Sequence, residues 1–179
     1  SVLFSSQDID LVYGSPSLRR HYLDITLSQL DNTYLRELQR YNQVLIQRNH
    51  LPRLLQGGSA TKAEMGFWNQ ALAASGSYIT LQRMEFIETL NKLAPPIHLG
   101  ITGEKAGLRL HYLQNVGDSE LRSRESLESA FYKALAQLEW QEIERGMSLA
   151  GPHRDDIKFF LAHIDMGIYG SRGQHRTIA

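Results

Sequence analysis

Apolar residues recur at helical spacing along two long segments of this chain, and this pattern restricts the fold more than any other feature. In the first segment the apolar residues are separated by four, three and four positions: Tyr34, Leu38, Tyr41 and Leu45. In the second segment, which follows residues 59–62, the stripe consists of Trp68, Leu72, Ile79, Phe86, Leu90 and Leu93. Such spacing places the side chains on one face of a helix. We therefore expect two long amphipathic helices that pack antiparallel as a hairpin.

Breaker residues set the expected ends of these two helices. Pro52 lacks a backbone donor and Gly57-Gly58 follow it, so the first helix is expected to reach the low fifties and to kink or stop before the turn at Gly57-Gly58. Gly76 and Arg83 interrupt the second stripe. Pro95-Pro96 are expected to end the second helix.

Two further helices are expected on either side of the hairpin. Gly14-Ser15-Pro16 combines a turn glycine, a capping serine and a first-turn proline, and predicts a helix from there to Leu30. Residues 118–145 predict a third long helix closed by Gly146. Its expected inward residues are Leu127, Phe131, Leu135, Leu138 and Ile143.

Apolar residues change to a period of two after the prolines, which is typical of strands. Ile97, Leu99 and Ile101, a loop over residues 102–107, and then Leu108, Leu110 and Tyr112 predict a β-hairpin. A further strand is expected at Ile157, Phe159 and Leu161. The fold class predicted from these patterns is α+β and predominantly α, with a long helical hairpin, a third long helix and short β elements.

Composition excludes several classes of protein. The chain has 42% hydrophobic residues, 19 basic and 19 acidic side chains and no cysteine, so disulfides and thiolate zinc sites are excluded. No membrane span or signal peptide is predicted, and a cytoplasmic protein is expected.

Any contact with DNA must be local, because the chain has no net basic excess. Residues 11–62 contain seven basic and three acidic side chains. This surface is either a phosphate-binding face or an ordinary solvated helix face, and the sequence favours neither interpretation. The candidate DNA-binding residues are Arg19, Arg20, Arg36, Arg40, Arg48 and Arg53.

Two strings near the carboxyl end carry the most specific signal. The first is Gly151-Pro152-His153-Arg154-Asp155-Asp156, and Ser171-Arg172-Gly173-Gln174-His175-Arg176 follows one strand and a turn later. Other strings precede them in the chain: Val2-Leu3-Phe4, Gly14-Ser15-Pro16 with Arg19-Arg20, and Tyr41 with Gln47-Arg48-Asn49. Taken in order, these strings closely resemble the RecF family of ABC/SMC-like recombination-repair ATPases. Because the chain opens without methionine and closes where an apolar helix is starting, we expect an internal part of such a protein.

The resemblance implies a division of the chain. Residues 1–13 would be the tail of an ATPase lobe, residues 14–148 a helical lobe with a small β-hairpin, and residues 149–179 the return to the ATPase lobe. The β elements would belong to, or border, this P-loop lobe of ABC type. Ser171, Arg172, Gly173 and Gln174 would form the signature motif, which reaches the γ-phosphate of ATP held by the opposite protomer. A serine-capped helix start with unpaired N–H groups suits a phosphate.

His153, Arg154, Asp155 and Asp156 would mark the junction where the chain returns to the ATPase lobe. Ion pairs that shape this junction are our preferred interpretation. His153, Asp155 and Asp156 are also candidate metal ligands, although no further ligand cluster is evident.

The function implied by the resemblance is an ATP-dependent clamp on DNA at single-strand to double-strand junctions, in recombinational repair and replication. It would act as an ATP-dependent homodimer, with RecR as a partner and RecO as a further candidate. ATP and Mg²⁺ would be bound mainly by segments outside this chain, which has no G-x-x-x-x-G-K-[ST] loop and alone should not hydrolyse ATP.

Two other classes of function stay open. One is a purely structural helical module that braces the ATPase head or recruits a protein partner. The other is a metal-dependent nuclease that uses His153, Asp155 and Asp156.

Overall fold

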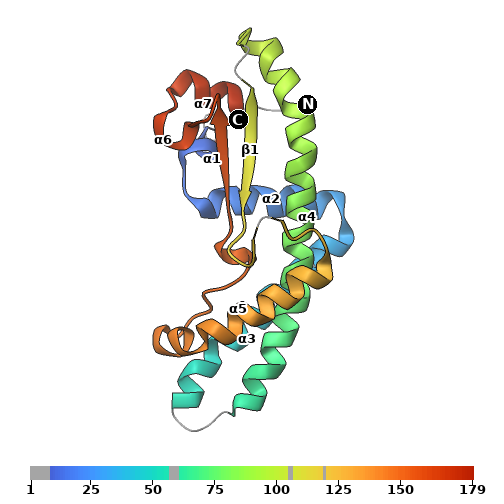
Figure 1. Cartoon of the computed structure of the whole chain (residues 1–179), viewed down its shortest axis with the longest axis vertical. Helices are drawn as coiled ribbons and strands as arrows, with labels where there is room; N and C mark the ends of the chain where they lie inside the picture. The colour runs from blue at the N-terminus through green and yellow to red at the C-terminus, as the bar shows by residue number, and fades with distance from the viewer. Residues whose placement is uncertain (1–8, 57–60, 105–106, 119) are drawn as a thin grey trace. The chain divides into compact units, whose positions relative to one another are not determined.

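The computed structural model describes residues 9–56, 61–104, 107–118 and 120–179, apart from the side chains of residues 52, 53, 56 and 62. The predicted turn at Gly57-Gly58 and the string Val2-Leu3-Phe4 lie outside these residues. The elements, drawn in Figure 1, are α1 (Asp10–Tyr13), α2 (Pro16–Leu30), α3 (Asn32–Gln56), α4 (Lys62–Thr102), β1 (Leu108–Leu113), α5 (Arg124–Arg145), the 3-10 helix η1 (Pro152–Arg154), β2 (Asp156–Leu161), β3 (Ile164–Asp165), α6 (Met166–Tyr169) and α7 (Arg172–Ile178). Long helices with a small antiparallel sheet confirm the predicted α+β, predominantly α class. Within this part of the chain, every helix is too short or too polar to be a membrane span.

The chain divides into two compact units, each assembled from separate segments. Unit 1 contains the described residues within Ser1–Thr26, Arg83–Leu113 and Asp155–Ala179. Unit 2 contains those within Leu27–Gln82 and Gln114–Arg154. The assignment of residues 14–148 to a helical lobe and of both flanking segments to an ATPase lobe stays a prediction.

The predicted helical hairpin is formed by α3 and α4 in unit 2 (Figure 1). Tyr34 and Tyr41 of the first stripe are buried, with at most 1% of their surface exposed. Tyr41 lies against Gly76 of α4, and Arg48, further along α3, bonds to Asn69, which comes earlier in α4. The two helices therefore run antiparallel.

The first predicted helix is α3, which continues through Pro52 and ends at Gln56, before Gly57-Gly58. Proline removes one hydrogen bond from the preceding turn, and the burial of Leu51 in unit 2 stabilises the helix across this gap.

Pro95-Pro96 do not end α4, and residues 97–101 are helical instead of forming a strand. Two prolines remove backbone hydrogen bonds, but tertiary contacts hold α4 on both sides of them. Ala94 packs against the core of unit 1. His98, which is 3% exposed, lies 3.3 Å through its Nε2 from the hydroxyl of Thr177. Burial therefore outweighs the local helix break, and the predicted local β-hairpin is wrong.

The strand predicted at residues 108–112 exists as β1, but its partner is β2. The sheet has the order β1-β2-β3 with antiparallel pairs, and Leu110 lies opposite Phe159. Alternate side chains turn toward one face and form the core of unit 1 with residues of α1, α2, α4 and α6. The buried strand residues are Leu108, Leu110, Ile157, Phe159 and Leu161.

The third long helix, α5, begins later than expected. Ser123 is its N-cap and forms a reciprocal capping box with Ser126, which satisfies the first free amide groups and sets the helix start at Arg124. The helix ends before Gly146, whose φ of 65° is the left-handed conformation that glycine adopts easily. Of the expected inward residues, Leu127, Phe131 and Leu135 are buried, whereas Leu138 and Ile143 are half-buried.

Gly76, which interrupts the apolar stripe of α4, is required by the packing of unit 2. A Cβ atom at this position would lie 2.2 Å from Cε1 of Phe131 and 3.1 Å from Cε2 of Tyr41. We predict that Gly76→Ala lowers the free energy of unfolding by about 1–3 kcal/mol, the usual range for overpacking, measured by urea denaturation. Gly66→Ala is the matched control in the same helix, because a Cβ there meets no atom within 4 Å, and it should stabilise by up to about 1 kcal/mol. Equal shifts in both variants would contradict the steric explanation.

Candidate functional site

The start of α7 is an exposed, doubly capped helix tip. The Ser171 hydroxyl accepts a hydrogen bond from the Gln174 amide (3.3 Å), and the Gln174 side-chain oxygen accepts one from the Ser171 amide (2.9 Å). Ser171, Arg172 and Gly173 are exposed. The amides of Arg172 and Gly173 have no acceptor inside the helix and lie at an open surface.

The rest of α7 is fixed to unit 1, so the tip has a defined position. His175 is 8% exposed, and its Nε2 lies 2.7 Å from the carbonyl oxygen of Met166. Its ring stacks on Tyr13, with ring centroids 5.3 Å apart. Beside the tip, Tyr13, His175, Arg172 and Ile9 line a hollow of about 370 Å³.

The first half of the junction string is held inside unit 2. Gly151 has a φ of 127° and lies against Tyr41, so this close approach requires glycine. His153 contacts the Tyr41 hydroxyl through Nδ1 (2.6 Å) and the Ser148 carbonyl oxygen through Nε2 (3.1 Å). Arg154 donates to the same carbonyl oxygen. These contacts fix the backbone just before β2.

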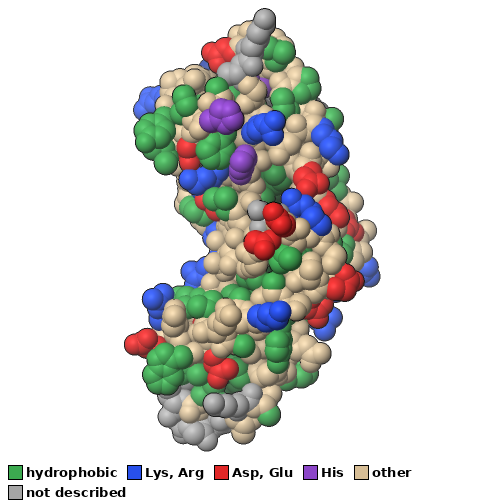
Figure 2. All heavy atoms as spheres, in the orientation of Figure 1, with side chains coloured by type: hydrophobic (Ala, Val, Ile, Leu, Met, Phe, Trp, Pro, Cys, Tyr) green, Lys and Arg blue, Asp and Glu red, His purple; other side chains and the backbone are tan. Residues whose placement is uncertain are grey.

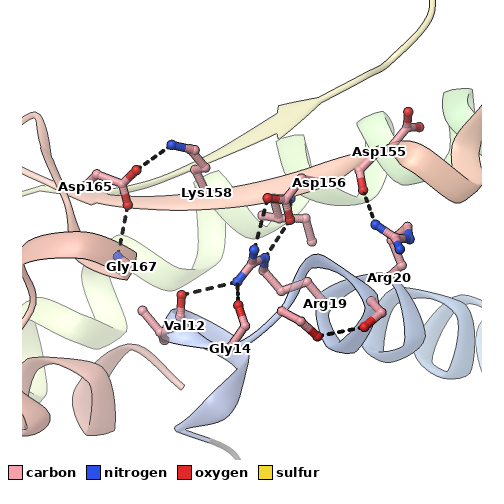
Figure 3. A network of polar contacts seen from close by, with 12 residues as sticks. Val12, Gly14, Arg19, Arg20, Asp155, Asp156, Lys158, Asp165 and Gly167 are labelled. Atoms are coloured by element: carbon pink, nitrogen blue, oxygen red, sulfur yellow. Dashed lines mark hydrogen bonds and ion pairs between the residues drawn. The ribbon is translucent and has the colours of Figure 1, made fainter.

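Asp156, at the start of β2, forms a bidentate ion pair with Arg19 (Figure 3). The two hydrogen bonds, from Nε and Nη2 of Arg19, are 2.6 and 3.0 Å long. The remaining Nη1 group donates to the carbonyl oxygens of Gly14 (2.7 Å) and Val12 (3.4 Å). One guanidinium therefore joins the turn between α1 and α2 to the sheet.

Asp155 lies in a second polar cluster of unit 1. Its side chain accepts a hydrogen bond from the Tyr112 hydroxyl, and its carbonyl oxygen accepts one from Arg20 (2.8 Å). Arg83 pairs with Asp24 at 2.7 Å and also acts on the Tyr112 hydroxyl. Burial lowers the pKa of Arg20, and the charge of Arg83 lowers it further. The cluster is therefore a set of mutually paired internal charges.

Burial dominates the chemistry of Tyr112. Part of its ring is accessible, but its hydroxyl lies in buried surroundings. Burial raises the pKa of Tyr112 well above 10, the charge of Asp155 raises it further, and Arg83 opposes the shift. The phenol is therefore protonated in the folded protein and acts as a hydrogen-bond donor.

Arg48 forms a buried ion pair in unit 2. Its guanidinium lies 2.5 Å from Glu142, and each side chain is only 1% exposed. Further bonds from Arg48 reach Asn69 (2.8 Å) and Ser148 (2.7 Å). The other Glu142 oxygen accepts the Leu149 amide at 2.7 Å. These bonds use every donor group of the guanidinium fork and both carboxylate oxygens.

The predicted DNA-binding arginines fall into three groups. Arg19 and Arg48 are buried, and their charges are used in internal pairs, a placement that does not fit contact with phosphates. Arg20 is half-buried, whereas Arg36 and Arg40 are exposed on α3. The side chain of the sixth candidate, Arg53, lies outside the described residues.

The structure does not bring the candidate metal ligands together. His153 belongs to unit 2, while Asp155 and Asp156 belong to unit 1. Both ring nitrogens of His153 have other partners. Among the described residues, no group of three histidine or carboxylate side chains is arranged to hold a metal ion.

Sequence reasoning missed three polar residues that organise the two units. Arg83 gave a signal, since it interrupts an apolar helical stripe. Tyr112 was expected on the apolar face of a strand, and Glu142 on an outward helix face. Neither position differs in pattern from its neighbours, so no local feature of the sequence indicates their buried partners.

No family model matches the chain. The chain is 44% identical over 178 residues to the DNA replication and repair protein RecF of Herpetosiphon aurantiacus. The aligned region covers 98% of this chain and 44% of the relative. RecF of Bacillus thuringiensis is 38% identical over 179 residues, 99% of this chain and 48% of the relative. Solved structures of the recombination mediator protein RecF-ATPrS and RecF-ATP in the RecFOR pathway match with a TM-score of 0.93 at 28% identity, over 99% of this chain and 47% of theirs.

The structural matches show that the chain has the fold of a segment of a recombination mediator protein. The chain is related to the RecF family over nearly all of its length, in sequence and in fold, which confirms the predicted resemblance. The chain spans about half the length of the curated relatives it matches.

The raised pKa of Tyr112 predicts a specific alkaline effect. The unfolded phenol ionises near pH 10, but the folded one stays protonated to higher pH. Its stabilising contribution is therefore complete below pH 10 and is lost as pH rises above that value. Tyr112→Phe should show a smaller loss of unfolding free energy above pH 10 than the unmodified protein, measured by urea denaturation at a series of pH values. Tyr132→Phe, at a 48% exposed side chain, is the control, and identical alkaline slopes for Tyr112→Phe and the unmodified protein would refute the effect.

The Arg48–Glu142 pair predicts strong non-additivity. Glu142→Gln leaves a buried guanidinium without its counter-charge and should lower the unfolding free energy by about 3–5 kcal/mol, measured by chemical denaturation. The double variant Arg48→Met with Glu142→Leu removes both charges and should recover much of that loss. Glu144→Gln, at an exposed position of the same helix, should have little effect. A double variant as unstable as Glu142→Gln would contradict the pairing.

Proposed function

We propose that this chain is the part of an ATP-dependent DNA-binding clamp that supplies a helical lobe and a signature motif acting in trans. The clamp would work in recombinational DNA repair and replication, where it supports recombinase loading at gaps. The observation that carries this proposal is the match along nearly the whole chain to proteins named for DNA replication and repair, with solved relatives in ATP-bound form. Single-strand to double-strand junctions are the proposed DNA target.

The tip of α7 supports the proposed nucleotide contact. Its first-turn amides and the guanidinium of Arg172 are exposed together, and the helix dipole adds positive potential there. Gly173 leaves the surface open, since a Cβ at this position would meet only the Ser171 hydroxyl, at 3.9 Å. These residues fit the terminal phosphate of an ATP bound by a second protomer. Ser171 and Gln174 would act by fixing the helix start through their capping box.

The remaining parts of the proposal concern groups outside this chain. Hydrolysis requires a phosphate-binding loop, which this sequence lacks, so we assign ATP hydrolysis and Mg²⁺ binding to other segments of the intact protein. The proposed partners are a second copy of the protein, RecR and, as a further candidate, RecO. The proposed compartment is the cytoplasm.

Side-chain exposure supports some of the candidate arginines for the proposed DNA contact more than others. Arg36 and Arg40 of α3 have exposed side chains and are the best candidates, and Arg20 is partly accessible. Arg19 and Arg48 act in our proposal as structural residues, because a buried charge that leaves its partner for a phosphate would strand a carboxylate inside the fold.

A structural brace is the second candidate function. It is favoured by the extensive internal pairing of the junction residues His153, Arg154, Asp155 and Asp156. In this reading the chain would support the ATPase head without contacting nucleotide.

Substitution of Arg172 in the full-length protein separates the two functions. Arg172→Ala should abolish ATP-dependent dimerisation while nucleotide binding is retained, because the missing guanidinium would act only on nucleotide bound by the other protomer. Sedimentation velocity with and without ATP measures the first property, and equilibrium binding of a fluorescent ATP analogue measures the second. Arg145→Ala, which removes an exposed guanidinium from unit 2, is the control. Dimerisation unchanged by Arg172→Ala would favour the brace.

A further inference from the structure

The sheet of unit 1 has one face turned to the core and one turned to solvent. The side chains that alternate with the buried apolar residues are Arg109 and His111 on β1 and Phe160 on β2. Arg109 lies directly opposite Phe160 in the register of the two strands, and His111 lies opposite Lys158. Figure 2 shows histidine, cationic and apolar side chains gathered over these two strands.

The turn after β2 extends this surface. Ala162 and His163 adopt positive φ values of 46° and 71°, which sets His163 at the edge of the same face. The described residues that line a hollow of about 310 Å³ here are Gly107, Arg109, His111, Phe160, Ala162 and His163. We call the set Arg109, His111, Phe160 and His163 the sheet platform. Positive φ is uncommon for non-glycine residues and often occurs where a loop has a function.

The permanent charge of the sheet platform is the guanidinium of Arg109. None of the described residues that line the hollow is an aspartate or a glutamate. Asp165, which lies opposite Phe160 in the register of β2 and β3, binds Lys158 and the Gly167 amide (Figure 3). Arg109 makes no hydrogen bond or ion pair with the described part of the chain. A ligand for this face must therefore bring negative charge.

The aromatic ring of the platform indicates the second property of the ligand. Phe160 is partly exposed on the solvent face, and its ring lies 4.9 Å from the His111 ring at an angle of 57°. A ring supported at its edge by a second ring presents a flat apolar surface on which a planar group can stack. An apolar protein segment would cover Phe160 but would also bury the charge of Arg109 without a partner, which is costly.

We infer that the sheet platform binds single-stranded nucleic acid, with a base stacked on Phe160 and the backbone phosphates held by Arg109 and the flanking imidazoles. Flat aromatic side chains on a sheet with nearby cations are the usual means of binding single strands. A duplex fits less well, because its bases are stacked inside the helix and cannot reach Phe160. This inference rests on the proposed DNA-binding function and assigns it a surface distinct from the helix tip and from α3.

The test uses the full-length protein and fluorescein-labelled oligothymidylate, with binding followed by fluorescence anisotropy. A second oligonucleotide of the same length carries abasic sites in place of the bases. Phe160→Ala should weaken binding of oligothymidylate about fivefold or more and leave binding of the abasic strand unchanged. Phe160→Trp should restore binding, which shows that loss in the alanine variant does not come from misfolding.

Arg109→Ala should weaken binding of both oligonucleotides, because phosphates are present in each. The slope of log affinity against log salt concentration should fall by about 0.7, as expected for one lost phosphate contact on a single strand. Lys92→Ala and Leu93→Ala, at neighbouring exposed positions on α4 in the same unit, are the controls for lost charge and lost apolar surface, and both should bind as the unmodified protein does.

The outcomes separate this inference from the broader proposal. If the unmodified protein binds oligothymidylate but Phe160→Ala binds it equally well, or loses the abasic strand to the same degree, the sheet platform is refuted while DNA binding stands. If the unmodified protein binds neither strand, both the platform and the proposed DNA-binding function are refuted.

Discussion

The ion pair between Arg19 and Asp156 connects the amino-terminal helices α1 and α2 to β2, which lies far along the chain. Its side chains are 9% and 20% exposed, so solvent screens the pair much less than it screens a surface pair. The same guanidinium satisfies the carbonyl oxygen of Gly14, which fixes the turn that leads into α2. Because Asp156 begins β2, this contact also sets where the sheet starts. The position of the sheet in turn determines where α6 and α7 follow.

Asp155, the neighbour of Asp156, adds a second set of polar contacts to unit 1. Asp155, the residue just before β2, meets Tyr112 through its side chain and Arg20 through its carbonyl oxygen, whereas the side chain of Asp156 meets Arg19. Two neighbouring arginines of α2 thus bind two neighbouring residues at the start of β2: Arg19 the carboxylate of Asp156, and Arg20 the carbonyl oxygen of Asp155. Buried pairs of this kind contribute less to stability than their attraction suggests, since desolvation opposes it, but an alternative packing would leave a charge unpaired. We therefore regard them as determinants of one specific arrangement of unit 1.

Both candidate contact surfaces of unit 1 are placed by its core. The apolar residues of β1 and β2 face inward, and this orientation forces Arg109 and Phe160 outward. His175 is anchored on α6 and on Tyr13, so that the residues before it are held at the surface. Exposed polar groups on rigid supports lose little conformational freedom when a ligand binds. The packing of the buried apolar residues therefore determines which side chains are exposed at the two candidate contact surfaces.

Local chemistry in the sequence was enough to predict much of this protein. Amphipathic spacing predicted the hairpin of α3 and α4, capping residues predicted α2 and the end of α5, and the two carboxyl-terminal strings identified the RecF resemblance. Each of these features depends on residues close together in the chain, whose geometry the backbone fixes. The tertiary structure decided the rest. It carried α4 through Pro95-Pro96, paired β1 with β2 instead of a nearer segment, and buried Arg19 and Arg48 beside carboxylates distant in sequence. A sequence pattern shows that a side chain is charged, but whether that charge meets solvent or a buried partner depends on which distant segments the fold brings together.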